Sequence, residues 1–324
     1  MSDLIPDPSS IPVPSVILEP SVIPEGGESS DLGGLLSLVW QTFKENRLAL
    51  VSLGVLGFFV IFCFLGPYIY PTNQTNQYLA VTTLINGNIS TNYPWFHSWS
   101  YLLGTDSTGY NLIGRLMVGG RTALLVGILA GLISTALGSI YGAISGYRGK
   151  ILDSAMMRFV DIGLSVPGLF LIIVIVVLFG QSSSTITLTL GLTSWFGSSR
   201  LIRGETLSLK SREFISAVKV LGGSNRRIIF RHILPNTLGT MIVVGTFAVA
   251  DAILALAALG FIGLGIPLPN TDWGSMLNTG VTFANNGYWW EIVPASICIV
   301  AVVISLNYIG DALRDGFEVR LQKR

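Results

Sequence analysis

The feature that most limits how this chain can fold is a series of long apolar runs that contain no charged side chain. The runs lie at residues 48–70, 122–147, 162–199, 233–250, 252–271 and 292–310. A bilayer core about 30 Å thick is crossed by about 20 apolar residues in an α-helix. Charged residues make up only 11% of the chain, whereas soluble domains average about 25%. With so few charges the chain cannot cover a water-facing surface, so the runs predict an integral membrane protein.

The number of crossings follows from the longest run, 162–199, which is too long for one span. Its centre, Gly180-Gln181-Ser182-Ser183-Ser184, is typical of a turn, so we divide the run into two helices. The result is an all-α membrane protein with six transmembrane helices, because an unpaired strand in lipid would leave its backbone unsatisfied. Seventeen of the 19 Lys and Arg residues then fall on one side, and cytoplasmic loops are the basic ones. Both termini are therefore predicted to be cytoplasmic.

Composition divides the chain into five regions. They are a Pro-rich tail (1–34), an N-terminal segment with the first transmembrane helix (35–70), an external loop (71–115), a transmembrane core (116–310) that includes a cytoplasmic segment (200–235), and a cytoplasmic C-terminal tail (311–324). No basic residue precedes Lys44, so the Pro-rich tail is not a signal peptide, and we expect it to be disordered. Its role and any glycosylation at the sequons of Asn73 and Asn88 stay open.

The second run carries glycines at helical spacing. They are Gly127, Gly131, Gly138, Gly142 and Gly146. Residues four apart share a helix face, and small residues let two helix backbones approach closely in lipid. The face is expected either to pack inside the bundle or to line a subunit seam or a path through the membrane.

Asp251 is the one acidic residue inside the apolar runs of the fifth span, near the middle of the membrane. A charge at that depth costs at least about 2.5–3.5 kcal/mol on insertion scales. The residue is therefore expected to face the bundle interior, a partner or water. It is either a polar element of a translocation path or a structural carboxylate that bonds a neighbouring helix.

The cytoplasmic segment 200–235 holds the most informative pattern. Phe214, Ala217, Val218 and Leu221 recur at i, i+3, i+4 and i+7, which predicts one apolar stripe on a short helix. Gly222-Gly223 then ends that helix, since glycine tolerates the left-handed C-terminal conformation. A water-facing helix of this kind either lies on the membrane surface or docks with a cytoplasmic partner.

This segment resembles the "EAA" loop of binding-protein-dependent ABC importer permeases. The matching residues are Glu213-x-x-x-Ala217-x-x-x-x-Gly222, followed by Ile233-Leu234-Pro235. In that family the loop forms a coupling helix that seats on an ATPase subunit. The resemblance implies ATPase-coupling roles for Glu213, Phe214, Ala217, Val218, Leu221, Gly222 and Gly223. The chain departs from the motif at Val218, where the family has a second alanine.

Further motifs in the same order resemble the dipeptide, oligopeptide and nickel branch of that family. They are Leu103-Gly104-Thr105-Asp106-x-x-Gly109 with Arg115 and Gly120-Arg121, Asp161-x-x-Leu164-Ser165-x-Pro167, Phe261-Ile262-Gly263-Leu264-Gly265 with Trp273-Gly274-x-Met276-Leu277, and Asn307-x-x-Gly310-Asp311-x-Leu313-Arg314-Asp315. Many relatives carry a glutamate where Leu256 stands here, which leaves the role of Asp251 open.

The resemblance implies a permease subunit of a prokaryotic cell-membrane importer. Its partners would be a second homologous permease, two cytoplasmic ATPase subunits that bind ATP and Mg²⁺, and an extracytoplasmic solute-binding protein. The branch suggests di- and oligopeptides as substrates, with oligosaccharides or nickel chelates as alternatives. Nucleic acid is not expected as a partner, because the net charge is only +1.

Chemistry within the chain itself is not expected. The sequence has no Gly-x-x-x-x-Gly-Lys-Ser/Thr phosphate loop, so ATP hydrolysis belongs to a partner. His97 and His232 fall on opposite sides of the membrane, and Cys63 and Cys298 lie in apolar runs, so neither pair suggests a metal site or other cofactor. An intramembrane enzyme would need a catalytic cluster, and a secondary transporter would show internal repeats, which we do not find.

Overall fold

The computed structural model describes residues 40–72, 83–85, 88–90, 102–106, 109–284 and 289–322. Within these residues the chain is nearly all helical, as predicted. One small antiparallel pair joins β1 (Thr83–Ile85) to β2 (Asn88–Ser90). The predicted tail 1–34 and the sequon residue Asn73 lie outside the described residues.

The helices follow one another with short connections. They are α2 (Arg47–Phe64), α3 (Gly66–Ile69), α4 (Leu112–Arg148), α5 (Lys150–Ser165), α6 (Gly168–Phe179), α7 (Ser183–Thr193), α8 (Phe196–Lys210), α9 (Glu213–Val220), α10 (Asn225–Ile228), the π-helical η3 (Ile229–Ile233), α11 (Leu234–Asn236), α12 (Leu238–Phe261), α13 (Trp273–Phe283), the 3₁₀ turn η5 (Trp289–Glu291) and α14 (Val293–Gln322).

Four helices in the described part of the chain are long and apolar enough to cross a membrane, namely α2, α4, α12 and α14. A fifth crossing is possible if α5 and α6 form one broken span, since the pair passes the same test with a bend of 81°. The bend falls at Val166-Pro167, where proline disfavours helix in the preceding residue and has no N–H to donate. The predicted count of six spans is therefore not confirmed.

The fourth predicted span differs most from expectation. The helix there, α7, has only 11 residues and would cover about 16 Å at 1.5 Å per residue, too little to cross a bilayer core alone. The chain breaks at Ser194-Trp195 and resumes as α8, so residues 200–210 of the predicted cytoplasmic segment are helical. Both α7 and α8 pack along α4.

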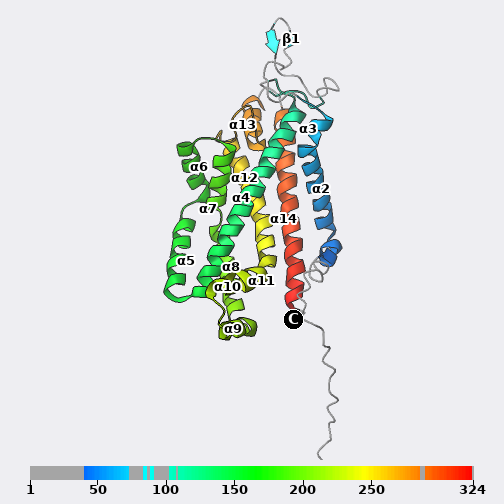
Figure 1. The fold of residues 1–324 in the computed structure, drawn as a ribbon. Helices are drawn as coiled ribbons and strands as arrows, with labels where there is room; N and C mark the ends of the chain where they lie inside the picture. The colour runs from blue at the N-terminus through cyan, green and yellow to red at the C-terminus, as the bar shows by residue number, and fades with distance from the viewer. Residues whose placement is uncertain are drawn as a thin grey trace, which may run out of the picture.

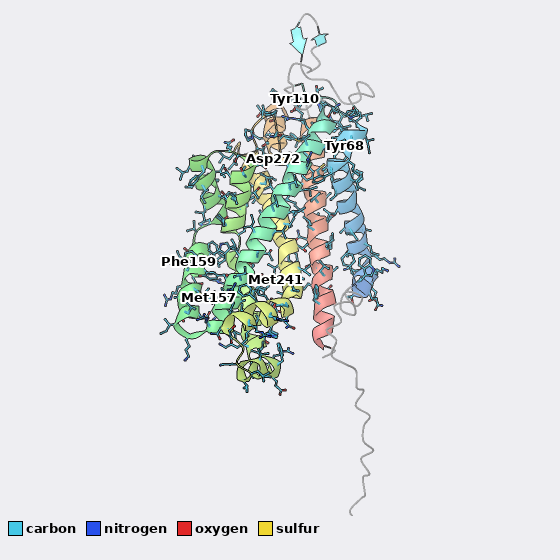
Figure 2. All side chains as sticks on the ribbon, viewed as in Figure 1. Tyr68, Tyr110, Met157, Phe159, Met241 and Asp272 are labelled. Carbon is cyan, nitrogen blue, oxygen red and sulfur yellow. The ribbon has the colours of Figure 1, made fainter. Side chains whose placement is uncertain are left out.

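The helices form one elongated bundle with α4 at its centre (Figure 1). Its main packing partners are α8, α12, α7 and α2. At one end of the bundle lie α8 to α11 and the C-terminal end of α14, which we call the α9 end (Figure 1). At the other lie α3 and α13, the α13 end. Asp272 and Tyr110 are near the α13 end, whereas Met157 and Met241 lie towards the α9 end (Figure 2).

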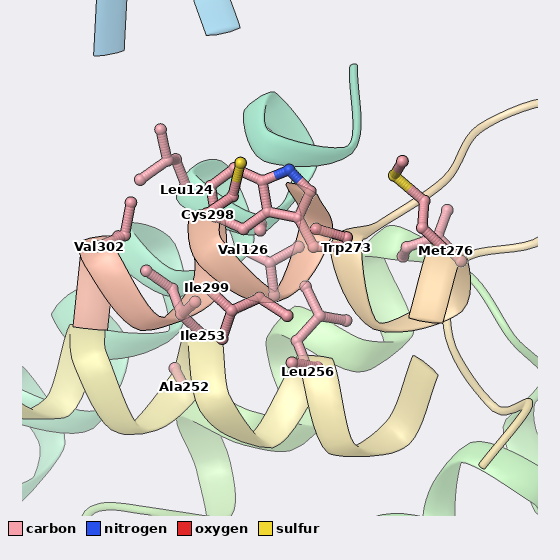
Figure 3. Close-up of a cluster of buried hydrophobic side chains, with 14 of the residues drawn as sticks. Leu124, Val126, Ala252, Ile253, Leu256, Trp273, Met276, Cys298, Ile299 and Val302 are labelled. Carbon is pink, nitrogen blue, oxygen red and sulfur yellow. The ribbon is translucent and has the colours of Figure 1, made fainter. Parts of the chain in front are cut away.

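The glycine face of α4 packs inside the chain, which agrees with the first of the two expectations. A Cβ at Gly127 or Gly131 would meet α12, and one at Gly138, Gly142 or Gly146 would meet α8. The main apolar core lies between α4, α12, α13 and α14, where Trp273 is surrounded by side chains that include Cys298 and Ile253 (Figure 3). Both cysteines are buried free thiols.

Candidate functional site

The predicted short helix is present as α9, and its end is built as expected. Arg212 precedes it in extended conformation, and Gly222 follows it at φ +79°, a left-handed conformation that favours glycine. The N–H of Gly223 donates to the carbonyl of Val218 at 2.9 Å, which closes the last turn. The helix therefore starts and stops at fixed residues and projects from the α9 end (Figure 1).

The residue that anchors α9 to the bundle is Ile215, which is only 2% exposed. It packs into a cluster that we call the α9 socket. The socket consists of Ala143, Tyr147, Ile202, Ile215, Ile228, Ile229 and Ile233. These residues come from α4, α8, α9, α10 and η3, so four other elements converge on one turn of α9. The sequence pattern missed this anchor, because Ile215 stands outside the predicted stripe.

The predicted stripe points mostly away from the bundle. Val218 packs partly against the socket, but Phe214, Ala217 and Leu221 are exposed, Leu221 at 85%. Val220, which the stripe did not include, is 87% exposed. At about 100° per residue, Ala217 lies roughly 200° around the helix from Ile215. Glu213, four residues before Ala217, lies on the same face as Ala217. One side of α9 is thus packed against the bundle, and apolar side chains on the other side are exposed.

An ion pair fixes the helix that leads into α9. Nε and Nη2 of Arg203 on α8 donate to the two carboxylate oxygens of Asp153 on α5, each at 2.6 Å. The hydroxyl of Ser145 on α4 donates to the same carboxylate. Paired N–H donors matched to a carboxylate give the strongest and most directional ion pairs. Three helices are therefore held together near the root of α9, and Arg200 adds a second, exposed pair with Asp161.

With this geometry in place, the comparison with known families is decisive. Residues 136–323 match the family described as "Binding-protein-dependent transport system inner membrane component". The chain belongs to this family. Residues 34–86 in addition match the "N-terminal TM domain of oligopeptide transport permease C".

Individual relatives cover most of the permease. It is 35% identical over 284 residues to the dipeptide transport system permease protein DppC of Bacillus subtilis (strain 168), covering 88% of this chain and 85% of that protein. It is 38% identical to the oligopeptide transport system permease protein OppC of Haemophilus influenzae, covering 86% and 88%. A chain of the inward-facing MetNI methionine ABC transporter aligns at 19% identity and TM-score 0.48, over 61% of this chain and 94% of that one.

Asp251 lies on α12 with its side chain exposed on the surface of the single permease chain. It is the fourteenth residue of this 24-residue helix, close to the middle of a candidate span. Asp251 is therefore far from α9, and within the described part of the chain its carboxylate forms no hydrogen bond or ion pair with another helix. Leu256, one and a half turns later, is fully buried.

Two acidic residues that the sequence did not single out are built into the permease. Glu205 on α8 is partly buried, and this burial raises the pKa of its carboxyl, an effect partly offset by a hydrogen bond with Thr240. Asp272 caps α13 at the opposite end and is 1% exposed. The one sequence signal for its capping role is that Asp272 stands directly before Trp273, the first residue of a helix, and Asp is a favoured N-cap residue.

Asp272 ties the turn before α13 to the helix itself. Its carboxylate accepts hydrogen bonds from the N–H of Ile266, the N–H of Ser275 and the hydroxyl of Ser275, at 2.9, 2.9 and 2.6 Å. The indole Nε1 of Trp273 then donates to the carbonyl of Leu116 on α4 at 2.9 Å. The α13 end is thus fastened to the same long helix that packs against α8 at the α9 end.

Proposed function

We propose that the chain is one of two related permease subunits of an ATP-driven importer of di- and oligopeptides. The observation that carries this proposal is α9, seated by Ile215 and presenting exposed apolar side chains within the family's coupling motif. Membership of the family supports the peptide substrate, and so do its relatives, which are dipeptide and oligopeptide transport permeases.

In this proposal the chain has six spans with cytoplasmic termini, and the α9 end faces the cytoplasm of a prokaryotic cell. Two ATPase subunits bind ATP and Mg²⁺, and one of them docks on the α9 helix of each permease. A solute-binding protein delivers substrate to the α13 end. The chain supplies no catalytic group. Closure of the ATPases moves α9, and the bundle switches between two packings as rigid elements.

Ala217→Arg tests the docking face, because Ala217 is exposed and its replacement does not disturb the socket. We expect the ATPase subunits to be lost from a mild-detergent pull-down and peptide uptake to fall at least tenfold, since a charge would be desolvated in an apolar contact. Gly222→Val should act similarly by straining the left-handed turn. The variant chains should still insert in the membrane at normal levels.

Lys219→Gln is the matched control, since Lys219 lies on the side of α9 nearer to Ile215. It should retain the ATPase and uptake. If Ala217→Arg keeps the ATPase bound under conditions that preserve other complexes, α9 is not the coupling helix and a secondary transporter becomes the better explanation. Substrates that compete for uptake distinguish peptides from oligosaccharides and nickel chelates.

Asp251 is proposed to line the translocation path, where an exposed carboxylate at mid-membrane would meet water or the second permease. Asp251→Leu is expected to reduce uptake at least tenfold while the complex still assembles, and Asp251→Asn should reduce it less, because the amide keeps a polar group in place. Leu254→Met, three residues along the exposed side of α12, is the control. Normal uptake and assembly of Asp251→Leu would exclude both a path role and a structural role.

A further inference from the structure

Tyr147 occupies an unusual place in the last turn of α4. Its side chain is 7% exposed, and its ring belongs to the α9 socket together with Ile215. The residue lies 66 positions before α9 in the sequence (Glu213 is the first residue of α9). Its ring nevertheless contacts a residue just before α9, and its hydroxyl contacts a residue just after α9.

Lys210 is the contact before α9. It is the last residue of α8, and its Nζ lies over the Tyr147 ring, 5.6 Å from the ring centroid. A cation within about 6 Å of an aromatic centroid is attracted by the negative face of the ring. The ammonium group also lies beside Gly149, because a Cβ built at that residue would be 3.4 Å from Nζ. The chain therefore enters α9 from a point held against Tyr147.

Asn225 is the contact after α9. It is the first residue of α10, and its Oδ1 accepts a hydrogen bond from the Tyr147 hydroxyl at 3.2 Å. Ser224, just before it, caps α10 by accepting from the N–H of Arg227 at 3.3 Å, which fixes the turn that presents Asn225. The chain therefore leaves the Gly222-Gly223 turn at a second point held against the same tyrosine.

The other end of α4 is fastened too. α4 has 37 residues, about 55 Å at 1.5 Å per residue, and its Leu116 carbonyl accepts the indole hydrogen bond of Trp273. A displacement of α9 that reaches Tyr147 is thus carried along one continuous helix to the α13 end. The apolar contacts of Ile215 and Val218 hold α9 along one face only, whereas the two polar attachments restrain the chain on both sides of the helix.

From this arrangement we infer that Tyr147 is a positioning residue. It couples the residues on either side of α9, Lys210 and Asn225, to α4, so that movement of the ATPases is passed to the transmembrane bundle. This inference rests on the proposed function and adds a specific residue to it. Tyr147 does not touch substrate or nucleotide. Its hydroxyl sets how much of the movement of α9 reaches α4.

The test compares transport with ATP hydrolysis in the full complex, reconstituted in proteoliposomes with its binding protein and supplied with labelled alanine peptides of two to five residues. Tyr147→Phe keeps the ring and removes only the hydroxyl, and Asn225→Ala removes the acceptor at an exposed position. Each should lower the peptide taken up per ATP hydrolysed roughly three- to tenfold, the effect of one lost hydrogen bond. A loss of stability alone would lower both rates together and leave their ratio unchanged.

The double variant Tyr147→Phe/Asn225→Ala should be no worse than either single one, because both remove the same hydrogen bond. Asn225→Asp, which keeps an acceptor oxygen, should restore the ratio. Tyr141→Phe is the matched control, since this hydroxyl on the same helix donates to the carbonyl of Met156 at 3.0 Å and touches neither root of α9. It should leave the ratio at the wild-type value.

Wild-type ratios for both single variants, or additive losses in the double variant, would overturn the role of Tyr147 and leave the proposed function standing. The absence of ATP-dependent uptake of any of these peptides by the wild-type complex would overturn the proposed function and this inference with it. The wild-type measurement therefore separates the two failures.

Discussion

Gly142→Ala is expected to separate α4 from α8, to destabilise the chain and to abolish transport. A Cβ at residue 142 would stand 2.9 Å from the backbone nitrogen of Arg203 and would overlap the carbonyl oxygen of Ser199. Both are backbone atoms of α8, so no side chain can turn aside, and the two helices must separate. Overpacking of this kind costs about 3 kcal/mol, which corresponds to a drop of roughly 5–10 °C in the Tm of the detergent-purified chain.

The consequence for function follows from what α8 carries. If α8 moves away from α4, Arg203 no longer meets Asp153 in the paired geometry, and α9 loses its support in the socket. We therefore expect the ATPase to be lost from pull-downs as well as a lower Tm. Thermal unfolding monitored by size-exclusion chromatography measures the Tm, and the pull-down measures the loss of the ATPase.

Gly204→Ala on α8 is the control for that experiment. A Cβ at residue 204 meets nothing within 4 Å, so the change adds a good helix former without a clash. Its Tm should equal or slightly exceed that of the wild type. A wild-type Tm for Gly142→Ala would show that α4 and α8 are farther apart than this packing requires.

Asp272→Ala is expected to have the second large effect, at the opposite end of the bundle. The change leaves the buried N–H of Ile266 without its acceptor and removes the N-cap of α13, which is the hydrogen bond from the N–H of Ser275. An unsatisfied buried donor costs about 1–3 kcal/mol, and a lost cap typically about 1 kcal/mol, so the total loss is about 2–4 kcal/mol. The Tm in detergent should fall accordingly, and uptake should be lost.

Asp272→Asn keeps the shape of the side chain but replaces one acceptor oxygen with an NH₂ donor. One amide oxygen can still accept a hydrogen bond, but the NH₂ group would face a donor, so the loss should be about half as large. Asn270→Ala, exposed two residues earlier, should change the Tm little. Because α13 and α9 lie at opposite ends, Asp272→Ala should retain the ATPase in a pull-down whenever the complex survives purification. Loss of the ATPase with unchanged Tm would contradict this separation.

The sequence alone determined the parts of this protein that depend on local pattern. Charge-free runs predicted helices in lipid, because a backbone in hydrocarbon must satisfy its own hydrogen bonds. The glycines of α4, spaced by four, predicted a face for close helix contact, and Gly222 predicted where α9 ends. The ordered motifs predicted the permease family. All of these signals are read over a few neighbouring residues or at a fixed helical period.

The tertiary structure alone decided which residues meet across long separations. Asp153 meets Arg203, and Tyr147 meets Asn225, only because α4, α5, α8 and α10 pack at particular rotations that no fixed spacing encodes. The same packing selected Ile215 to anchor α9 and turned the predicted stripe outwards. The structure also shows that α7 is too short to cross the bilayer alone. It packs along α4 and the chain continues as α8, so α7 need not cross by itself.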